Sequence, residues 1–372
     1  MQRGTFGAGS QPATVVTFGE IMLRIASLNY LKFRQSLPGH VDVTFAGAEA
    51  NVAASLSMFG CPVKFVTALP KHSIADACIG TLRNVGIDTS DILMVDQGRI
   101  GIYFVETGAN QRPSTVIYDR AGASIAAADP SIYDWKKIFQ GVKWLHITGI
   151  TPALSKLAAD ATLDAVKTAR GMGLTISCDL NYRKKLWDWE PGVSAKELAG
   201  KVMNGILPFV DILIGNEEDA EDVLGIKAGD TDVNLGKLDY ERYPSVAREI
   251  VKKYPNIKKI GTTLRESISA SHNNWGAMLY NASSDKCYFA PNAEGQYRPY
   301  EIRNIVDRIG GGDSFTAGLI YCSLEGKSDE ESLAFGVAAS CLCHSVYGDF
   351  NYSTKEEVLA LMKGDATGRV KR

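Results

Sequence analysis

The sequence predicts an α/β protein built on a doubly wound, mostly parallel sheet that is flanked by helices. β-rich runs alternate with stretches of helical spacing along most of the 372 residues, an order typical of parallel sheets whose crossovers are helices. The chain is 45% hydrophobic and 22% charged, as expected for a globular protein. Residues 23–45 and 98–127 lack helical periodicity and contain short β-like pieces, which predicts a small β-sheet lid at one edge.

The expected elements follow one another in a regular order. In the first half, strands are expected at 14–19, 63–68 and 143–147, and helices at 48–59, 73–85 and 155–170. In the second half, strands are expected at 174–179, 211–214 and 258–263, and helices at 195–206, 243–254, 313–324, 329–346 and 353–362. We expect a single domain over residues 14–363, a surface insertion at 228–242, and flexible tails at 1–13 and 364–372.

Charge and composition argue against several classes of protein. The formal net charge is -2, and the absence of a long basic run argues against nucleic acid as a partner. No run reaches the roughly 18 apolar residues that a membrane span needs, and the N-terminal segment does not resemble a signal peptide. The cysteines are odd in number and include no CxxC pair, which predicts reduced thiols in a cytoplasmic protein.

A run of glycines before an aspartate is the most informative segment of the chain. Gly310, Gly311 and Gly312 precede a predicted helix, and Asp313 stands at its start. Glycines let backbone N–H groups converge on one point, and a helix N-terminus attracts anions. The segment therefore predicts a site for a transferring phosphate, with Asp313 as the base that takes a proton from an attacking hydroxyl. From spacing alone, a tight turn with Asp313 as a helix N-cap remains the alternative.

Two other nucleotide-binding patterns are absent. Residues 325–328 come close to the end of a P-loop, but Tyr321 stands where the first glycine of that motif belongs. The first expected strand ends at Gly19 without the further glycines of a dinucleotide-binding turn. The sequence therefore supports neither a P-loop NTPase nor a dehydrogenase.

Three motifs resemble those of the PfkB (ribokinase-like) carbohydrate kinases, and the resemblance extends from about residue 14 to residue 351. Residues 307–315 resemble the family's DTxGAGD motif, residues 47–53 its N-terminal Gly-x-x-x-Asn motif, and residues 216–219 its NxxE motif. The resemblance implies a ribokinase-like fold, ATP as phosphate donor and Mg²⁺ as metal. It also implies a homodimer or a larger homo-oligomer, since the lids of related proteins often pair between subunits.

The metal-related positions depart from the family pattern. The resemblance implies that Asn216 and Asp219 order the water shell of Mg²⁺, although Asp219 stands where the family has glutamate and Glu218 is the neighbouring alternative. The two residues after Asp307 replace small or hydroxyl residues of the family. This argues against a monovalent-cation site of the ribokinase type, because Asp307 alone would not hold that ion.

Within the family, the similarity is closest to 2-keto-3-deoxygluconate kinases. Residues 46–51, 101–104, 118–120, 179–183 and 348–351 carry it. It implies a small acidic sugar whose primary hydroxyl accepts the phosphate, giving the 6-phosphate. Arg120 and Arg183 would grip the sugar carboxylate as bidentate forks, and Tyr103 and Tyr118 would cover a sugar face. The remaining sugar-binding residues implied are Gly47, Asn51 and Asp313.

Ordinary structural roles remain open for several of these residues. Arg183 stands beside two lysines and could belong to a solvated basic patch, Tyr103 could lie in the core, and Asn51 could bridge loops. A kinase for a neutral sugar such as fructose or ribose is the nearest alternative function. It predicts no dependence on Arg120 or Arg183. A non-catalytic sugar-binding relative is a third possibility, which the presence of Asp313 argues against.

ATP is expected to lie across the carboxyl ends of the strands, near the glycine run. The resemblance implies that Thr263 and Arg265, which follow a strand, reach the phosphates. It places Asn351 beside the base, together with small residues of the helix at 329–346. The other nucleotide-binding residues implied are Asn216, Gly310 and Gly312.

Overall fold

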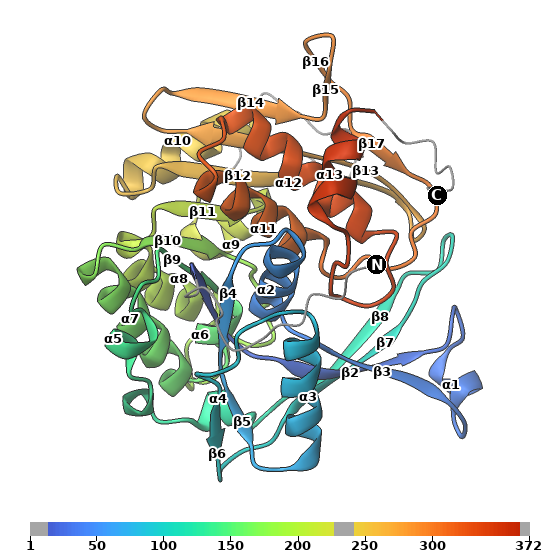
Figure 1. Cartoon of the computed structure of the whole chain (residues 1–372), viewed down its shortest axis with the longest axis vertical. Coiled ribbons are helices and arrows are strands. Elements are labelled where there is room, and N and C mark those ends of the chain that lie inside the picture. The colour runs from blue at the N-terminus through green and yellow to red at the C-terminus, as the bar shows by residue number, and fades with distance from the viewer. Residues whose placement is uncertain (1–13, 227–241, 365–372) are drawn as a thin grey trace, which may run out of the picture.

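The computed structural model describes residues 14–226 and 242–364 (Figure 1). The predicted N-terminal tail lies outside these residues, as do nearly all of the predicted insertion at 228–242 and of the C-terminal tail. Nine strands form the central sheet. In spatial order they are β14 (Lys286–Ala290), β13 (His272–Asn281), β12 (Lys259–Ser269), β11 (Ile212–Gly215), β10 (Thr175–Asp179), β9 (Trp144–Thr148), β1 (Val15–Phe18) and β4 (Val63–Val66), and β17 (Tyr300–Ile302) pairs with β13. The six strands from β12 to β4 are parallel, whereas β13, β14 and β17 are antiparallel.

Helices cover both faces of this sheet, because neighbouring residues of each strand point to opposite sides. Val16 and Leu145 belong to one buried cluster, and Val15 and Trp144 belong to another. The first cluster packs against α5 (Trp135–Ile138), α7 (Lys156–Gly171), α8 (Ala195–Ile206), α9 (Glu217–Leu224) and α10 (Tyr243–Lys253). The second packs against α2 (Ala48–Met58), α3 (Ser73–Asn84), α11 (Gly311–Leu324), α12 (Asp329–Cys343) and α13 (Lys355–Met362).

A second, smaller sheet projects from one edge of the molecule (Figure 1). Its strands, in spatial order, are β3 (Val41–Ala46), β2 (Met22–Ser27), β7 (Gly101–Glu106) and β8 (Thr115–Asp119). We call these four strands the small sheet. Arg24 lies opposite Tyr103, and Tyr103 opposite Tyr118, so these three residues share one face. Ile25 lies opposite Val43 and Phe104, and Phe104 opposite Ile117, so an apolar row occupies the other face.

The remaining elements are short. They are α1 (Phe33–Ser36), β5 (Ala68–Pro70), β6 (Leu93–Val95), α4 (Ser124–Ala127), η1 (Pro130–Ile132), α6 (Ile150–Ala153), η2 (Leu207–Phe209), β15 (Asn292–Ala293) and β16 (Gln296–Tyr297). No helix within the described residues combines the length and the apolar character needed to cross a bilayer.

The predicted fold class is confirmed, with a mostly parallel sheet between two helical layers and a separate small sheet. Two features differ from the prediction. The strands β13, β14 and β17 add an antiparallel edge that the sequence did not indicate. The helix expected at 313–324 begins two residues earlier, at Gly311, which changes the geometry of the glycine run.

Candidate active site

The glycine run forms the start of α11 and the turn before it. Gly310 is the N-cap residue, with φ 87°, and Gly311 and Gly312 lie in the first helical turn. Asp313 is therefore the third residue of the helix, so the alternative that it acts only as the N-cap is wrong. The first N–H groups of a helix have no acceptor within it, and those of Gly311 and Gly312 make this turn a place for an anion. We call residues 307–312 the phosphate turn.

Gly310 and Gly312 contribute to the turn in different ways. Gly310 has a left-handed backbone, and a Cβ atom there would lie 2.2 Å from the carbonyl oxygen of Asp349. A side chain at this position would therefore force the two segments apart. Gly312 faces open space, because a Cβ atom added there would have no neighbouring atom within 4 Å. The backbone at Gly312 is consequently open to close approach by a ligand.

Asp313 is a buried carboxyl group held by an amide from α2. The Asn51 Nδ2 atom donates to Asp313 Oδ2 at 2.7 Å, and the Gly47 backbone N–H donates to Asn51 Oδ1 at 3.3 Å. Burial raises the pKa of Asp313 to about 7, the charges of Asp349 and Glu49 add to the shift, and the Asn51 hydrogen bond opposes it. A pKa near neutrality suits a group that accepts a proton at physiological pH.

Arg183 is the exposed cation beside this carboxyl group. It follows β10 in the chain, and its Nη1 atom donates to the carbonyl oxygen of Tyr182 at 3.0 Å. Its positive charge lowers the pKa values of Asp313, Asp179 and Asp219. No ion pair to Arg183 occurs within residues 14–226 and 242–364, so its guanidinium is available to an anionic ligand.

Arg120 is differently placed from what the sequence suggested. It is buried at the end of the small sheet and forms an ion pair with Glu20, which follows β1. Its guanidinium also lies 5.4 Å from the ring centre of Tyr118. Burial raises the pKa of Glu20, and the Arg120 charge opposes that shift. Arg120 therefore already has a protein partner. To bind a sugar carboxylate as well, its guanidinium would have to interact with that carboxylate and with Glu20 at the same time.

The two predicted tyrosines also differ in their surroundings. Tyr103 is buried, and its hydroxyl group donates to Asp349 at 2.6 Å. Tyr118 is 46% exposed, and its ring centre lies 6.1 Å from that of Tyr103. Tyr118 therefore offers the accessible aromatic face, whereas Tyr103 connects the small sheet to the segment around Asp349.

Asn216 and Asp219 form a reciprocal capping pair at the start of α9, in which the side chain of each accepts the backbone N–H of the other. Asn216 Oδ1 accepts the Asp219 N–H at 2.8 Å, and Asp219 Oδ2 accepts the Asn216 N–H at 3.1 Å. Asp219 Oδ1 accepts the Tyr182 N–H at 2.9 Å, so both carboxylate oxygens are bound by the backbone. Each oxygen keeps lone-pair capacity for a metal-bound water. The described residues contain no cluster of three or more His, Cys, Asp or Glu able to hold a metal directly.

The residues assigned to the nucleotide are not all free to bind it. Thr263 and Arg265 lie within β12. Arg265 is exposed. The pKa of Arg308 is lowered mainly by burial, and the charge of Arg265 adds to that shift. Asn351 is 1% exposed; its Nδ2 atom donates to the Ala339 carbonyl at 3.0 Å and its Oδ1 atom accepts the Ser353 N–H at 2.9 Å. These contacts give Asn351 a role in shaping the segment after α12, and its contact with the base stays a prediction.

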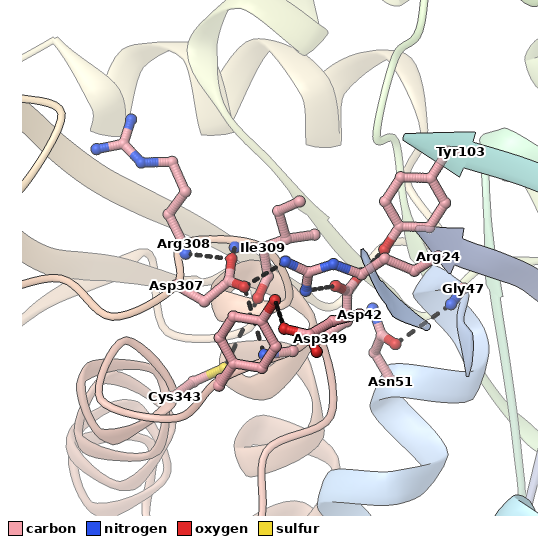
Figure 2. Close-up of polar contacts among 12 residues, drawn as sticks. Arg24, Asp42, Gly47, Asn51, Tyr103, Asp307, Arg308, Ile309, Cys343 and Asp349 are labelled. Carbon is pink, nitrogen blue, oxygen red and sulfur yellow. Dashed lines mark hydrogen bonds and ion pairs between the residues drawn. The ribbon is translucent and has the colours of Figure 1, made fainter. Parts of the chain in front are cut away.

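Sequence reasoning missed a buried ionic cluster beside the phosphate turn (Figure 2). Arg24 of β2 forms ion pairs with Asp307 at 2.5 Å and with Asp349 at 2.6 Å. It also missed Arg308, which has no acidic ion-pair partner within the described residues, and donates to the carbonyl oxygens of Ser269 and Ala270. The position of Arg308 within the DTxGAGD-like motif was the signal that could have identified it as a cation of the phosphate turn.

Comparisons with known proteins identify the family and the fold of this chain. A family model described as pfkB family carbohydrate kinase matches residues 12–355. The structure of 2-dehydro-3-deoxygluconokinase from Thermotoga maritima is 45% identical, with a TM-score of 0.85, and the match covers 95% of this chain and 100% of that one. A PfkB family carbohydrate kinase from Listeria grayi is 30% identical, with a TM-score of 0.82 and coverage of 94% and 99%.

A curated relative extends the comparison to a second sugar acid. The 2-dehydro-3-deoxygalactonokinase of Haloferax volcanii is 29% identical over 356 residues, covering 96% of this chain and 98% of that protein. The fold and these matches agree with one another. This chain is a member of the pfkB family of carbohydrate kinases, and its α/β fold is the ribokinase-like fold.

Proposed function

We propose that this protein transfers the γ-phosphate of ATP to the primary hydroxyl of 2-keto-3-deoxygluconate, giving the 6-phosphate. The observation that carries the proposal is Asp313, a buried carboxyl group whose pKa is raised to about 7 beside the open backbone of Gly312. Arg183 provides an exposed positive charge near the same carboxyl group. A base, an anion site and a cation for a sugar acid are thus close together.

Each residue has a defined part in the proposed reaction. Asp313 accepts the proton of the attacking hydroxyl, while Asn51 holds the carboxylate in place. The N–H groups at the start of α11 stabilise the negative charge on the transferring phosphate. Arg265 and Arg308 bind phosphate oxygens of the nucleotide. The small sheet closes as a lid over the sugar and excludes water, which would otherwise compete as the acceptor.

We propose Mg²⁺ as the metal that accompanies the nucleotide. The oxygen-rich pair of Asn216 and Asp219 fits the preference of this ion for oxygen donors and retained waters. Because both residues are already bound by the backbone, they would hold its water shell rather than the ion itself. When bound, Mg²⁺ neutralises charge on the phosphates.

Substrate choice is tested by measuring ATP consumption with four sugars. Recombinant protein is assayed with 2-keto-3-deoxygluconate, its galactonate epimer, fructose and ribose, with Mg²⁺ present. We expect kcat/KM for an acidic sugar to exceed that for fructose or ribose by at least about 30-fold, since losing a desolvated charge pair costs about 2–5 kcal/mol. A preference for fructose or ribose would instead support the neutral-sugar alternative. The two epimers decide between the gluconate and galactonate substrates.

We further propose a homodimer formed through the small sheet, in the cytoplasm. The apolar row across this sheet ends in Val43, 54% exposed, and Ile117, 55% exposed. An exposed apolar sheet face favours pairing with a second copy.

The cysteines bear on the proposed location in the cytoplasm. All seven are unpaired thiols, which supports a reducing compartment.

A further inference from the structure

The buried cluster around Arg24 contains more negative than positive charge. Arg24 is 1% exposed, and its Nη2 and Nη1 atoms contact Asp307 at 2.5 Å and Asp349 at 2.6 Å. Figure 2 shows the guanidinium lying between the two carboxylates. Within residues 14–226 and 242–364, no other cationic side chain forms an ion pair with either carboxylate. The mutual attraction of the three groups therefore depends on this one arginine.

The same cluster fixes the backbone on both sides of the phosphate turn. Asp307 Oδ1 accepts the N–H groups of Arg308 at 2.8 Å and Ile309 at 3.2 Å, and Oδ2 accepts that of Gly348 at 3.3 Å. The Asp349 carbonyl oxygen packs directly against Gly310. Movement of either carboxylate would consequently move the residues that set the direction of the first N–H groups of α11.

The cluster also connects the phosphate turn to the small sheet. Arg24 lies on β2, and Tyr103 on the neighbouring β7 donates its hydroxyl to Asp349 at 2.6 Å. The Cζ atom of Arg24 lies 5.5 Å from the ring centre of Tyr347. The hydroxyl group of Tyr347 donates to Asp42 on β3 at 2.9 Å. Three of the four strands of the small sheet thus contact the segments beside the turn.

A dissolved monovalent cation does not fit this arrangement. The space between the two carboxylates is filled by the guanidinium (Figure 2). The side chains of Arg308 and Ile309, which follow Asp307, offer no oxygen ligand. A planar guanidinium can donate to two carboxylates at once and remains charged at any pH at which the protein is folded, so a second cation is not needed there.

We propose that Arg24 is a positioning residue for phosphoryl transfer, and that its guanidinium supplies the fixed positive charge that a dissolved monovalent cation would otherwise supply beside the phosphate turn. The inference rests on the proposed function of the site. It predicts that the enzyme works equally well with and without potassium, and that Arg24 acts on kcat more than on either KM.

The first experiment changes only the cation around the wild-type enzyme. Phosphoryl transfer is measured with Mg²⁺ held constant, in about 0.1 M potassium chloride and in about 0.1 M tetramethylammonium chloride, so that screening is equal. We expect kcat to agree within about twofold, because a buried charge fixed by ion pairs is insensitive to the bulk cation. Activation by potassium of about fivefold or more would overturn the inference, because screening is equal in the two salts and only a specific effect of potassium could cause it.

The second experiment replaces the guanidinium. Arg24→Met should lower kcat by about 10²-fold, the effect of misplacing catalytic groups by about 1 Å, with smaller changes in both KM values. Added guanidinium ion should restore part of kcat, which a purely structural defect would not allow. Arg248→Met is the matched control: Arg248 lies on α10 and forms an exposed ion pair with Asp285 in the turn between β13 and β14, and this variant should behave as wild type. A folded Arg24→Met enzyme with unchanged kcat would overturn the inference.

A milder variant covers the case in which Arg24→Met does not fold. Arg24→Lys keeps the charge but cannot form the fork to both carboxylates, so we expect a folded enzyme with kcat lower by about tenfold, as for one lost charge-assisted contact. A kcat equal to that of wild type would contradict the positioning role. Absence of phosphoryl transfer by the wild type in every salt would instead contradict the proposed function, so the two failures are distinguishable.

Discussion

Asp313 is the residue on which the chemistry depends most directly. Asp313→Asn keeps the shape of the side chain and removes the proton acceptor, so kcat should fall by about 10²- to 10⁴-fold, the usual effect of a positioned base. ATP binding, measured by calorimetry, should change little. Asp160→Asn, which alters an exposed carboxylate on α7, is the control. Near-wild-type turnover in Asp313→Asn would exclude this residue as the base.

The ionisation of Asp313 predicts the pH dependence of the reaction. Its pKa is raised to about 7, mainly by burial, and only the ionised form accepts a proton. We therefore expect kcat/KM to rise with pH through about 7. The Asn51 hydrogen bond lowers this pKa, so Asn51→Ala should move the rise to higher pH. A profile that is flat between pH 5.5 and 8, or an unchanged midpoint in Asn51→Ala, would contradict the assignment.

Two arginines that look equivalent in the sequence should behave differently when replaced. Arg183→Ala should lower kcat/KM for the acidic sugar by about 30-fold or more, at about 1.4 kcal/mol per tenfold, and leave thermal stability unchanged. Arg120→Ala leaves the buried Glu20 without its partner, which typically costs about 3–5 kcal/mol of stability. Kinetics on the keto acid and on fructose, together with Tm values, test both. Equal losses on the two sugars would argue against carboxylate binding by Arg183.

The residues that could be predicted are those whose role is indicated by a short pattern in the nearby sequence. Three glycines and an aspartate before a helix indicated Asp313 from composition and spacing. The partner of Arg120 lies 100 positions away, and no local pattern shows that this arginine is already paired. Arg24 occupies an ordinary-looking strand, and only the folded chain reveals that it is buried between two carboxylates.

At the scale of elements, the two faces of the small sheet have different chemistry. One face carries Arg24 and Tyr103 toward the phosphate turn, and the other carries the apolar row that ends in Ile117. Ile117→Asp should therefore shift the proposed homodimer to monomer in light scattering coupled to size exclusion, because a buried charge opposes association. Leu157→Asp, an exposed leucine on α7, should not. A wild-type monomer, or a dimer that tolerates Ile117→Asp, would contradict this interface.

The predicted positions of helices and strands agree with the structure where the hydrophobic periodicity of the sequence is strong. Parallel strands such as β9 and β10, buried on both faces, produce short apolar runs that are easily found. The start of α11 was misplaced because glycine is a poor helix former, and here the turn geometry determines where the helix begins. The antiparallel edge of β13, β14 and β17 was missed for two reasons: β13 begins with three polar residues although most of it is buried, and β14 and β17 are short and mostly only partly buried.

At the scale of the whole molecule, the buried carboxyl groups predict an unusual stability profile. Burial raises the pKa values of Glu49, Asp179 and Asp313 to about 7 and that of Asp349 to about 6. Above pH 6 the unfolded chain holds fewer protons on these groups than the folded one, so stability falls as pH rises through 7. Burial lowers the pKa of His146 to about 3. This shift makes stability rise with pH, but that rise is complete by about pH 7, where the histidine is neutral in the unfolded chain as well.

This profile is checked by thermal unfolding without ligands. We expect Tm to be higher at pH 6.5 than at pH 8, with each titrating carboxyl contributing up to about 1.4 kcal/mol per pH unit. The double variant Asp179→Asn and Asp313→Asn should flatten the dependence. A Tm that rises steadily from pH 6.5 to 8 would show that these carboxyl groups are ionised at normal pKa values in the folded protein.

The long reach of the Arg24 cluster has a consequence for how the protein is made. Arg24 and Asp349 are separated by 325 positions, and a ribosome adds roughly 5–20 residues per second. Strand β2 therefore leaves the ribosome roughly 16–65 s before the second carboxylate that will hold it. A nascent chain stalled before residue 307 would contain most of the parallel sheet and lack both anchors of the turn. Catalytic competence is thus acquired only at the very end of translation, well after the core can begin to form.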